Sequence, residues 1–233
     1  PPRSPACHLL CLGFSAHPAP PVVAGLAGGR LGGAADAFAT RLPFLALVVD
    51  DSVTALQGAL GDDHGTLVNL GTGSFFIRRD GRGLTHHGGW GYVLGDEGSA
   101  AWLGRLALTM LTEIEDGRRA EFAEDPLRKV LLEASPPHPV LFAADSGAEN
   151  FASLAPLIFN RDTPMAVALQ RHVEGAVRSG LAAIKHPGGT PWVLTGGLGA
   201  ALADRLDGQL TAGLRPPAGS ALDGALAMAR ALP

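Results

Sequence analysis

Short apolar runs that end at glycine or aspartate alternate with helical patterns along this chain, and this order restricts it to a mixed α/β fold. The clearest run is 44–49, because it is fully apolar, contains β-branched residues and ends at two aspartates. The turn sequence at 80–83 predicts a β-hairpin. We predict strands at 22–24, 44–49, 66–70, 74–79, 192–195 and 210–214. We predict helices at 31–41, 52–60, 97–114, 163–186, 200–206 and 220–232, and another that starts at Pro126.

Composition limits the classes of function that the chain can have. Its 233 residues are 46% hydrophobic, which is enough for the core of one large or two small domains. The formal net charge of -4 provides no basic surface for nucleic acid, and no apolar run approaches the ~20 residues of a membrane span. The two cysteines, Cys7 and Cys11, lack the spacing of a paired zinc knuckle. We therefore expect a cytoplasmic protein with free thiols, no resident metal site, and neither nucleic acid nor membrane as a partner.

Two neighbouring aspartates follow the apolar run 44–49. Ligands of open α/β sheets bind at the carboxyl ends of strands, so Asp51 is a candidate general base for an attacking hydroxyl in phosphoryl transfer. An alternative is that Asp50 or Asp51 caps the helix that follows. Asp50 is also a rival for the catalytic role.

Two glycine-rich turns are candidates for contacts with a nucleotide. The segment 71–74, Gly-Thr-Gly-Ser, lies between two predicted strands, which disfavours a Walker A loop because that loop needs a lysine and a following helix. Such a turn can still direct backbone N–H groups and a hydroxyl to a phosphate. The second turn lies between strand 192–195 and a helix, where glycine permits a ring or ribose to come close. The alternative for the first turn is an ordinary glycine-rich hairpin, and an ordinary tight turn explains the second pattern equally well. The candidate residues are Gly71, Thr72, Gly73, Gly196 and Gly197.

The segment 88–100, GGWGYVLGDEGSA, combines an aromatic residue with two acids. An aromatic ring packs against sugar C–H groups, and carboxylates accept hydrogen bonds from sugar hydroxyls. Gly89, Trp90 and Asp96 are therefore candidate sugar contacts. One alternative is that Trp90 is packed in the interior. Another is that Asp96 and Glu97 stabilise the N-terminus of a helix, which suits Glu97 better.

Taken in this order, the motifs resemble the BadF/BadG/BcrA/BcrD-type ATPase family, and within it the N-acetylglucosamine kinases and bacterial glucosamine kinases. The resemblance covers residues 22–233, and the segment 88–100 is its most specific part. It implies the actin/hexokinase/Hsp70-like ATPase fold, in which two ribonuclease-H-like lobes close over Mg-ATP and a sugar. It also implies an ATP-dependent sugar kinase that phosphorylates an amino sugar at the 6-hydroxyl, with ATP and Mg²⁺ as cofactors.

The resemblance implies a role for each candidate residue. Asp51 would take the proton from the sugar 6-hydroxyl, and Gly89, Trp90 and Asp96 would line the amino-sugar site. Thr72 would contact the ATP phosphates, and Gly196 and Gly197 would face the adenosine part of the nucleotide. The expected partner is the small-molecule amino sugar, and assembly into a homodimer is left open.

The sequence departs from the family at two places. The family's first phosphate loop, Asp-Gly-Gly-Gly-Thr, does not occur. We therefore expect an unmatched leader at 1–21, an incomplete first lobe formed by 22–62 and 219–233, and a second lobe at 63–218. Phe75 replaces a polar sugar contact of some relatives, so glucosamine and N-acetylglucosamine both stay open as substrates. Two alternative functions stay open as well: a catalytically impaired sugar-binding or regulatory remnant of such a kinase, and an ATPase that activates a partner protein.

Overall fold

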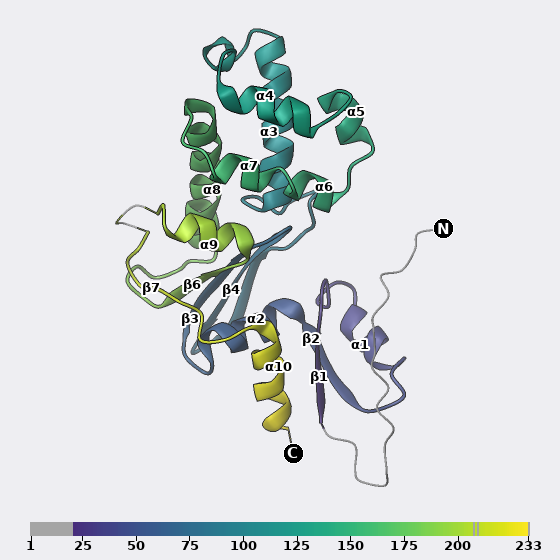
Figure 1. Cartoon of the computed structure of the whole chain (residues 1–233). Coiled ribbons are helices and arrows are strands. Elements are labelled where there is room, and N and C mark those ends of the chain that lie inside the picture. Colours follow the sequence, from purple (N-terminus) through teal and green to yellow (C-terminus); the bar gives the residue numbers. More distant parts are fainter. Residues whose placement is uncertain (1–20, 207, 209, 233) are drawn as a thin grey trace.

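A five-stranded mixed sheet forms the centre of the protein, whose computed structural model describes residues 21–206, 208 and 210–232 (Figure 1). The predicted leader, with both cysteines, lies outside the described residues except for Pro21. Strand order is β5-β4-β3-β6-β7, with antiparallel pairing from β5 to β3 and parallel pairing from β3 to β7. The predicted hairpin is confirmed, since Asp80 pairs with Gly83. The strands are β3 Gly65–Leu70, β4 Ser74–Asp80, β5 Gly83–Gly88, β6 Trp192–Thr195 and β7 Leu214–Arg215.

The two faces of this sheet carry separate apolar cores, because successive side chains of a strand point to opposite faces. Val68 and Leu70 of β3 belong to the larger core, together with residues of α3 (Ala100–Glu115) and α8 (Pro164–Ala183). Leu67 faces the other way and packs with α2 (Asp51–Leu60). Most of the helices therefore lie on one side of the sheet and α2 lies on the other (Figure 1).

A second sheet contains two parallel strands, β1 (Val22–Leu26) and β2 (Ala46–Asp50), which are connected through α1 (Ala34–Ala39). Helix α2 contacts both sheets, and α10 (Ala221–Arg230) packs along α2 and against β1 (Figure 1). Glycines permit this close approach, because a Cβ atom at Gly58 would overlap the carbonyl oxygen of Ser220. The last helix thus packs against the two-stranded sheet and α2.

The other helices cover the larger core or connect its parts. Helix α8 begins as predicted, because the Thr163 hydroxyl accepts the N–H of Ala166 at 3.3 Å and Pro164 occupies the first helical position. Within the described residues, no helix has the length and apolarity needed to cross a bilayer. The remaining elements are η1 Ala120–Phe122, α4 Pro126–Ala134, α5 Pro139–Ala144, α6 Ala148–Ala152, α7 Ala155–Phe159 and α9 Gly197–Ala203.

Several predicted boundaries are wrong, and four of them differ for a clear local reason. Positive φ at Gly32 and Gly33 delays the first helix, which forms as α1 and not over 31–41. Ser99 is the N-cap of α3, so the helix predicted from residue 97 starts at residue 100. The turn at Gly196 starts α9 three residues before the predicted 200–206 helix. Turn hydrogen bonds at Thr211 leave only β7 of the strand predicted over 210–214.

Candidate functional site

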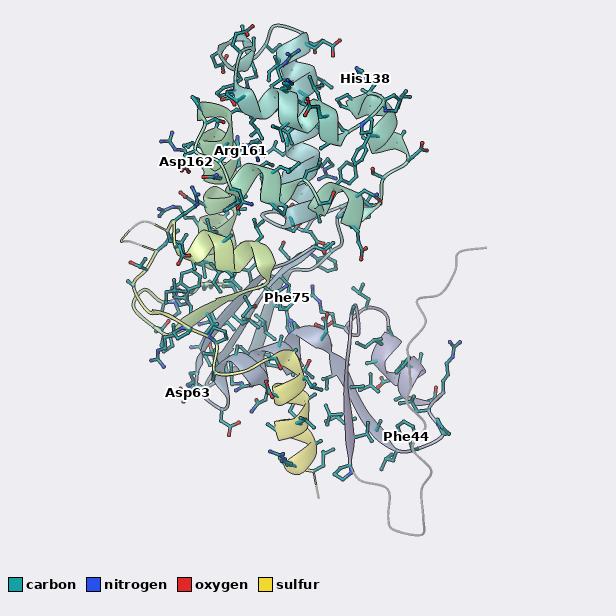
Figure 2. All side chains as sticks on the ribbon, viewed as in Figure 1. Phe44, Asp63, Phe75, His138, Arg161 and Asp162 are labelled. Atoms are coloured by element: carbon teal, nitrogen blue, oxygen red, sulfur yellow. The ribbon has the colours of Figure 1, made fainter. Side chains whose placement is uncertain are left out.

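A cavity of about 450 Å³ opens between the five-stranded sheet on one side and the loop after β1 with the start of α2 on the other. Asp51, at the start of α2, lies on one side, and the loop after β5 with Trp90 and Asp96 lies on the other. Figure 2 shows Phe75, another lining residue, at this junction. The structure therefore brings the candidate base and the three candidate sugar contacts around one cavity. Its lining residues are Ala27, Gly28, Leu31, Asp51, Asn69, Gly73, Ser74, Phe75, Gly89, Trp90, Gly91 and Asp96.

The two neighbouring aspartates have different partners. Asp50 ends β2 and caps α2: its Oδ1 accepts the N–H of Ser52 at 3.2 Å and also the Ser52 hydroxyl. Its Oδ2 accepts the N–H of Arg30 at 3.3 Å. Asp51 is the first residue of the helix and lines the cavity. The capping role therefore belongs to Asp50, and the carboxylate of Asp51 is the one placed for a ligand.

Burial and charge both act on the Asp51 carboxyl. Burial raises its pKa above the usual value for aspartate, and the nearby Asp50 charge raises it further. Backbone N–H groups of the first helical turn and the positive charge of Arg30 offset this increase only in part. A raised pKa suits a group that must accept a proton near neutral pH.

The loop after β5 holds Trp90 at the cavity mouth. Its ring is 60% exposed, so the alternative of a packed interior ring is wrong. Asp96 anchors this loop, because its Oδ1 accepts the N–H of Gly91 at 3.1 Å. Burial raises the pKa of the Asp96 carboxyl, and Glu97 adds to the increase. Asp96 and Glu97 do not begin a helix, since both precede the cap of α3.

The Gly71–Gly73 turn is held in shape by the start of α3. The N–H of Gly71 donates to the carbonyl of Gly73 at 2.9 Å, which closes the turn. The N–H groups of Ala100 and Ala101 donate to the carbonyls of Gly71 and Thr72 at 2.9 and 3.2 Å. Gly196 completes this packing, because its φ of 85° favours glycine and a Cβ atom there would overlap the Leu70 carbonyl.

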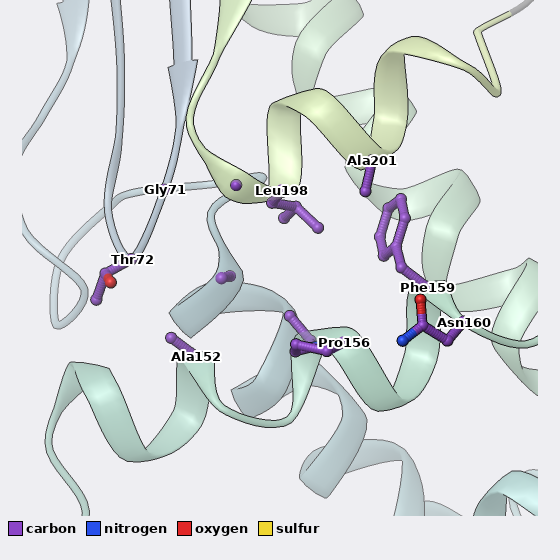
Figure 3. A pocket seen from close by; sticks show the side chains of 11 residues that line it. Gly71, Thr72, Ala152, Pro156, Phe159, Asn160, Leu198 and Ala201 are labelled. Atoms are coloured by element: carbon purple, nitrogen blue, oxygen red, sulfur yellow. The ribbon is translucent and has the colours of Figure 1, made fainter.

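A second cavity of about 360 Å³ lies on the other side of this turn. Figure 3 shows Thr72 at one end and Phe159 with Asn160 at the opposite end. Gly71 and Thr72 line this cavity, whereas Gly73 lines the first, so one short turn separates the two. The two adjacent glycines of the second candidate turn line different cavities. Gly197 lines the second cavity, and Gly196 lines a neighbouring cavity of about 620 Å³. The remaining lining residues of the second cavity are Ala100, Ala152, Ala155, Pro156, Leu198 and Ala201.

These residues fit a nucleotide bound with Mg²⁺. The second cavity has mostly apolar walls that suit a flat base, and it ends at a glycine turn and hydroxyl that suit phosphates. No group of three or more His, Cys, Asp or Glu side chains in the described part of the chain could hold a metal ion. Mg²⁺ needs no such group, because it usually binds through one or two carboxylates and the substrate phosphates.

Two residues near the first cavity were missed from the sequence. Asn69 lines it, and its Oδ1 accepts the Thr195 hydroxyl at 3.1 Å. The sequence does contain a signal for this residue, because it is a polar residue inside the predicted apolar strand 66–70. Arg30 contacts the loop of Trp90 from the two-stranded sheet. No local pattern marks Arg30, because this contact joins segments that are distant in the sequence.

Replacing Ser99 with alanine should destabilise the protein by about 1 kcal/mol, because the Ser99 hydroxyl accepts the N–H of Trp102 at 3.1 Å and caps α3. The matched control is Thr163→Ala, which removes the cap of α8 at a similar cost. Of these two helices, α3 is the one whose N–H groups bind the carbonyls of the Gly71–Gly73 turn, so Ser99→Ala, unlike Thr163→Ala, should also weaken ATP binding. Urea unfolding and ATP titration measure the two effects, and equal ATP affinity in both variants would contradict the assignment of that turn.

The protein has the actin/hexokinase-like ATPase fold, which it shares with solved structures. A solved structure from Chromobacterium violaceum, provisionally named N-acetylglucosamine kinase, superposes with a TM-score of 0.79 at 32% identity over 91% of this chain and 78% of that one. A Porphyromonas gingivalis protein with the same provisional name shares the fold, with a TM-score of 0.56, 22% identity and coverage of 90% of this chain and 76% of that one.

One curated relative is similar over a shorter segment. The N-acetylmuramic acid/N-acetylglucosamine kinase of Clostridium acetobutylicum is 37% identical over 73 residues, which are 31% of this chain and 24% of that protein. The match therefore spans about a quarter of the curated relative. No protein-family model matches the chain. From the extended similarity to the Chromobacterium protein, the chain belongs to the family of N-acetylglucosamine-kinase-like proteins.

Proposed function

We propose that this protein is an ATP-dependent kinase that phosphorylates an amino sugar, N-acetylglucosamine or glucosamine, at its 6-hydroxyl. One observation carries the proposal: Asp51, Trp90 and Asp96 surround a single cavity, and the Gly71–Gly73 turn separates that cavity from a second one. Two adjacent cavities with a shared glycine turn suit the transfer of a phosphoryl group from one ligand to another.

The first cavity has the chemistry of a sugar site. The exposed ring of Trp90 offers a face to sugar C–H groups, and the carboxylates of Asp51 and Asp96 can accept hydrogen bonds from hydroxyls. Leu31 and Phe75 add apolar surface that suits the methyl of an N-acetyl group. The names of the relatives from Chromobacterium and Clostridium support an amino sugar as the substrate class.

When bound, ATP would supply the phosphoryl group and leave as ADP, and Mg²⁺ would offset the charge of the phosphates. Thr72 and the neighbouring glycines would hold the phosphates, and Phe159 and Asn160 would lie at the base. Asp51 would accept the proton of the 6-hydroxyl as that oxygen attacks. Asp96 would fix the loop of Trp90 through the N–H of Gly91 and would orient the sugar.

Calorimetric titration and an assay of ADP release test the proposal on the purified protein. We expect binding of N-acetylglucosamine or glucosamine, ADP release that depends on the sugar, and a 6-phosphate product. Comparison of kcat/KM for the two sugars identifies the preferred one. Sugar binding without turnover would instead favour a catalytically impaired remnant. ATP hydrolysis at the same rate with and without the sugar would favour a partner-activating ATPase.

A further inference from the structure

Arg30 connects the two sheets across the mouth of the first cavity. It lies in the loop between β1 and α1, and three neighbours in this loop, Ala27, Gly28 and Leu31, line the cavity. The guanidinium donates to the carbonyl of Gly88, and its central carbon lies 5.1 Å from the centroid of the Trp90 ring. The Arg30 backbone N–H donates to the Asp50 carboxylate at 3.3 Å. Arg30 therefore contacts both the strand end beside the candidate base and the loop of the candidate sugar contact.

The loop of Trp90 depends on such contacts for its position. Gly89 and Gly91 flank the tryptophan with φ of 71° and 83°, a backbone region that glycine adopts readily. Asp96 holds the loop from the side of the five-stranded sheet, through the N–H of Gly91. Arg30 holds it from the two-stranded sheet by a charge-assisted hydrogen bond and a cation–π contact. The exposed Trp90 ring thus lies between two anchors, one from each sheet.

We propose that Arg30 is a positioning residue, which fastens the Trp90 loop to the two-stranded sheet and thereby sets the width of the sugar cavity and the charge beside Asp51. This inference rests on the proposed function, since it assumes that the first cavity binds the sugar. Arg30 then has two separable effects. The N–H groups of its guanidinium position the loop, and its positive charge favours the ionised form of Asp51.

Several charged or titratable groups lie in the surroundings of Asp51. Asp50 lies on β2, Asp96 lies across the cavity, and His86 of β5 contacts the Ser52 hydroxyl at 3.3 Å. Burial lowers the pKa of His86, and the charge of Arg30 lowers it further, so this imidazole is neutral at pH 7. Among the groups that act on the pKa of Asp51 in the described residues, Arg30 is the cation. Loss of its charge should therefore raise the pKa of Asp51.

The test compares Arg30→Gln, Arg30→Lys and a control, Arg41→Gln, which removes an exposed arginine outside the cavity lining. Arg30→Gln should raise the KM for the sugar about tenfold through loss of one cation–π contact and one charge-assisted hydrogen bond. It should also move the acid limb of the kcat/KM profile to higher pH. Arg30→Lys should restore the acid limb but not the KM, and Arg41→Gln should match the wild type in both. If Arg30 contributed only to stability, Arg30→Gln would lower the melting temperature, and Arg30→Lys would not restore the acid limb while leaving the KM raised.

Two readouts test the positioning role even if the wild type transfers no phosphate. Acrylamide quenching of Trp90, taken as the difference from a Trp90→Phe variant, needs no ligand and should increase in Arg30→Gln but not in Arg41→Gln. Calorimetric titration with N-acetylglucosamine should show weaker binding in the same variant. Wild-type quenching and wild-type sugar affinity in Arg30→Gln would overturn the inference. Failure of sugar binding in the wild type would overturn the proposed function instead, and quenching alone would then decide whether Arg30 positions the loop.

Discussion

Replacing Asp51 with asparagine should reduce the rate of sugar phosphorylation about 10³-fold, the usual contribution of a positioned general base. Asparagine keeps the size and the hydrogen-bonding capacity of the side chain, but it cannot accept the proton of the attacking hydroxyl. Sugar affinity should therefore stay close to that of the wild type. Single-turnover rates and calorimetric titration measure the two quantities. Turnover at the wild-type rate would remove Asp51 from the mechanism.

The same substitution should not destabilise the protein at neutral pH. Because the pKa of Asp51 is raised in the folded state, the folded protein binds more protons than the unfolded chain between the two pKa values. The free energy of unfolding therefore decreases as pH rises from the ordinary pKa of aspartate through the raised one. Asparagine does not ionise, so the variant does not lose this part of the free energy of unfolding. Its melting temperature should therefore equal or exceed that of the wild type at pH 7. Any gain should disappear below the ordinary pKa, where both states of the wild type are protonated.

Asp50→Ala is the matched control, because the two aspartates are neighbours with different contacts. It removes the cap of α2 together with the acceptor for the Arg30 N–H, so we expect a loss of about 1 kcal/mol or more in stability. The base is retained, so turnover per folded molecule should stay within tenfold of the wild type. Loss of turnover in Asp50→Ala, with retention in Asp51→Asn, would transfer the catalytic role to Asp50.

The elements that could be predicted from sequence are those whose determinants are local. Strands β3, β4 and β6 are short apolar runs between turn residues, and the cap and proline at the start of α8 are adjacent in the sequence. The start of α3 was wrong by three residues, because the acids at 96 and 97 resemble a helix start until the Ser99 cap is seen. That shift matters for the site, since it places Asp96 in a loop that faces the cavity.

The parts of the site that could not be predicted depend on tertiary packing. The sequence favours Asp51 as the base but leaves Asp50 as its rival until the start of α2 is known, and the structure makes Asp50 the N-cap and Asp51 the first helical residue. Arg30 carries no local signal, because its partners are distant in the sequence: Gly88 at the end of β5 and Trp90 in the loop that follows. The adjacent glycines at 196 and 197 line different cavities because the chain turns sharply between β6 and α9.

Replacing Gly58 with alanine should destabilise the protein by about 3 kcal/mol, in the upper part of the range for overpacking. The added methyl would overlap the carbonyl oxygen of Ser220, which is backbone and cannot rotate away, so α10 would have to move off α2. The effect should extend to the site, because α2 begins at Asp51. Urea unfolding followed by circular dichroism measures the loss. Gly224→Ala should give a similar result, since a Cβ atom there would overlap the carbonyl of Thr54.

Gly175→Ala is the control for this prediction and should change stability in the opposite direction. Gly175 also lies within a helix, α8, but a Cβ atom there meets nothing within 4 Å. Alanine should therefore stabilise the protein by up to about 1 kcal/mol through helix propensity alone. Equal stabilisation by Gly58→Ala would show that α10 does not pack against α2 in solution. Opposite signs for the two variants would show that the last helix packs against α2, the helix that begins at Asp51.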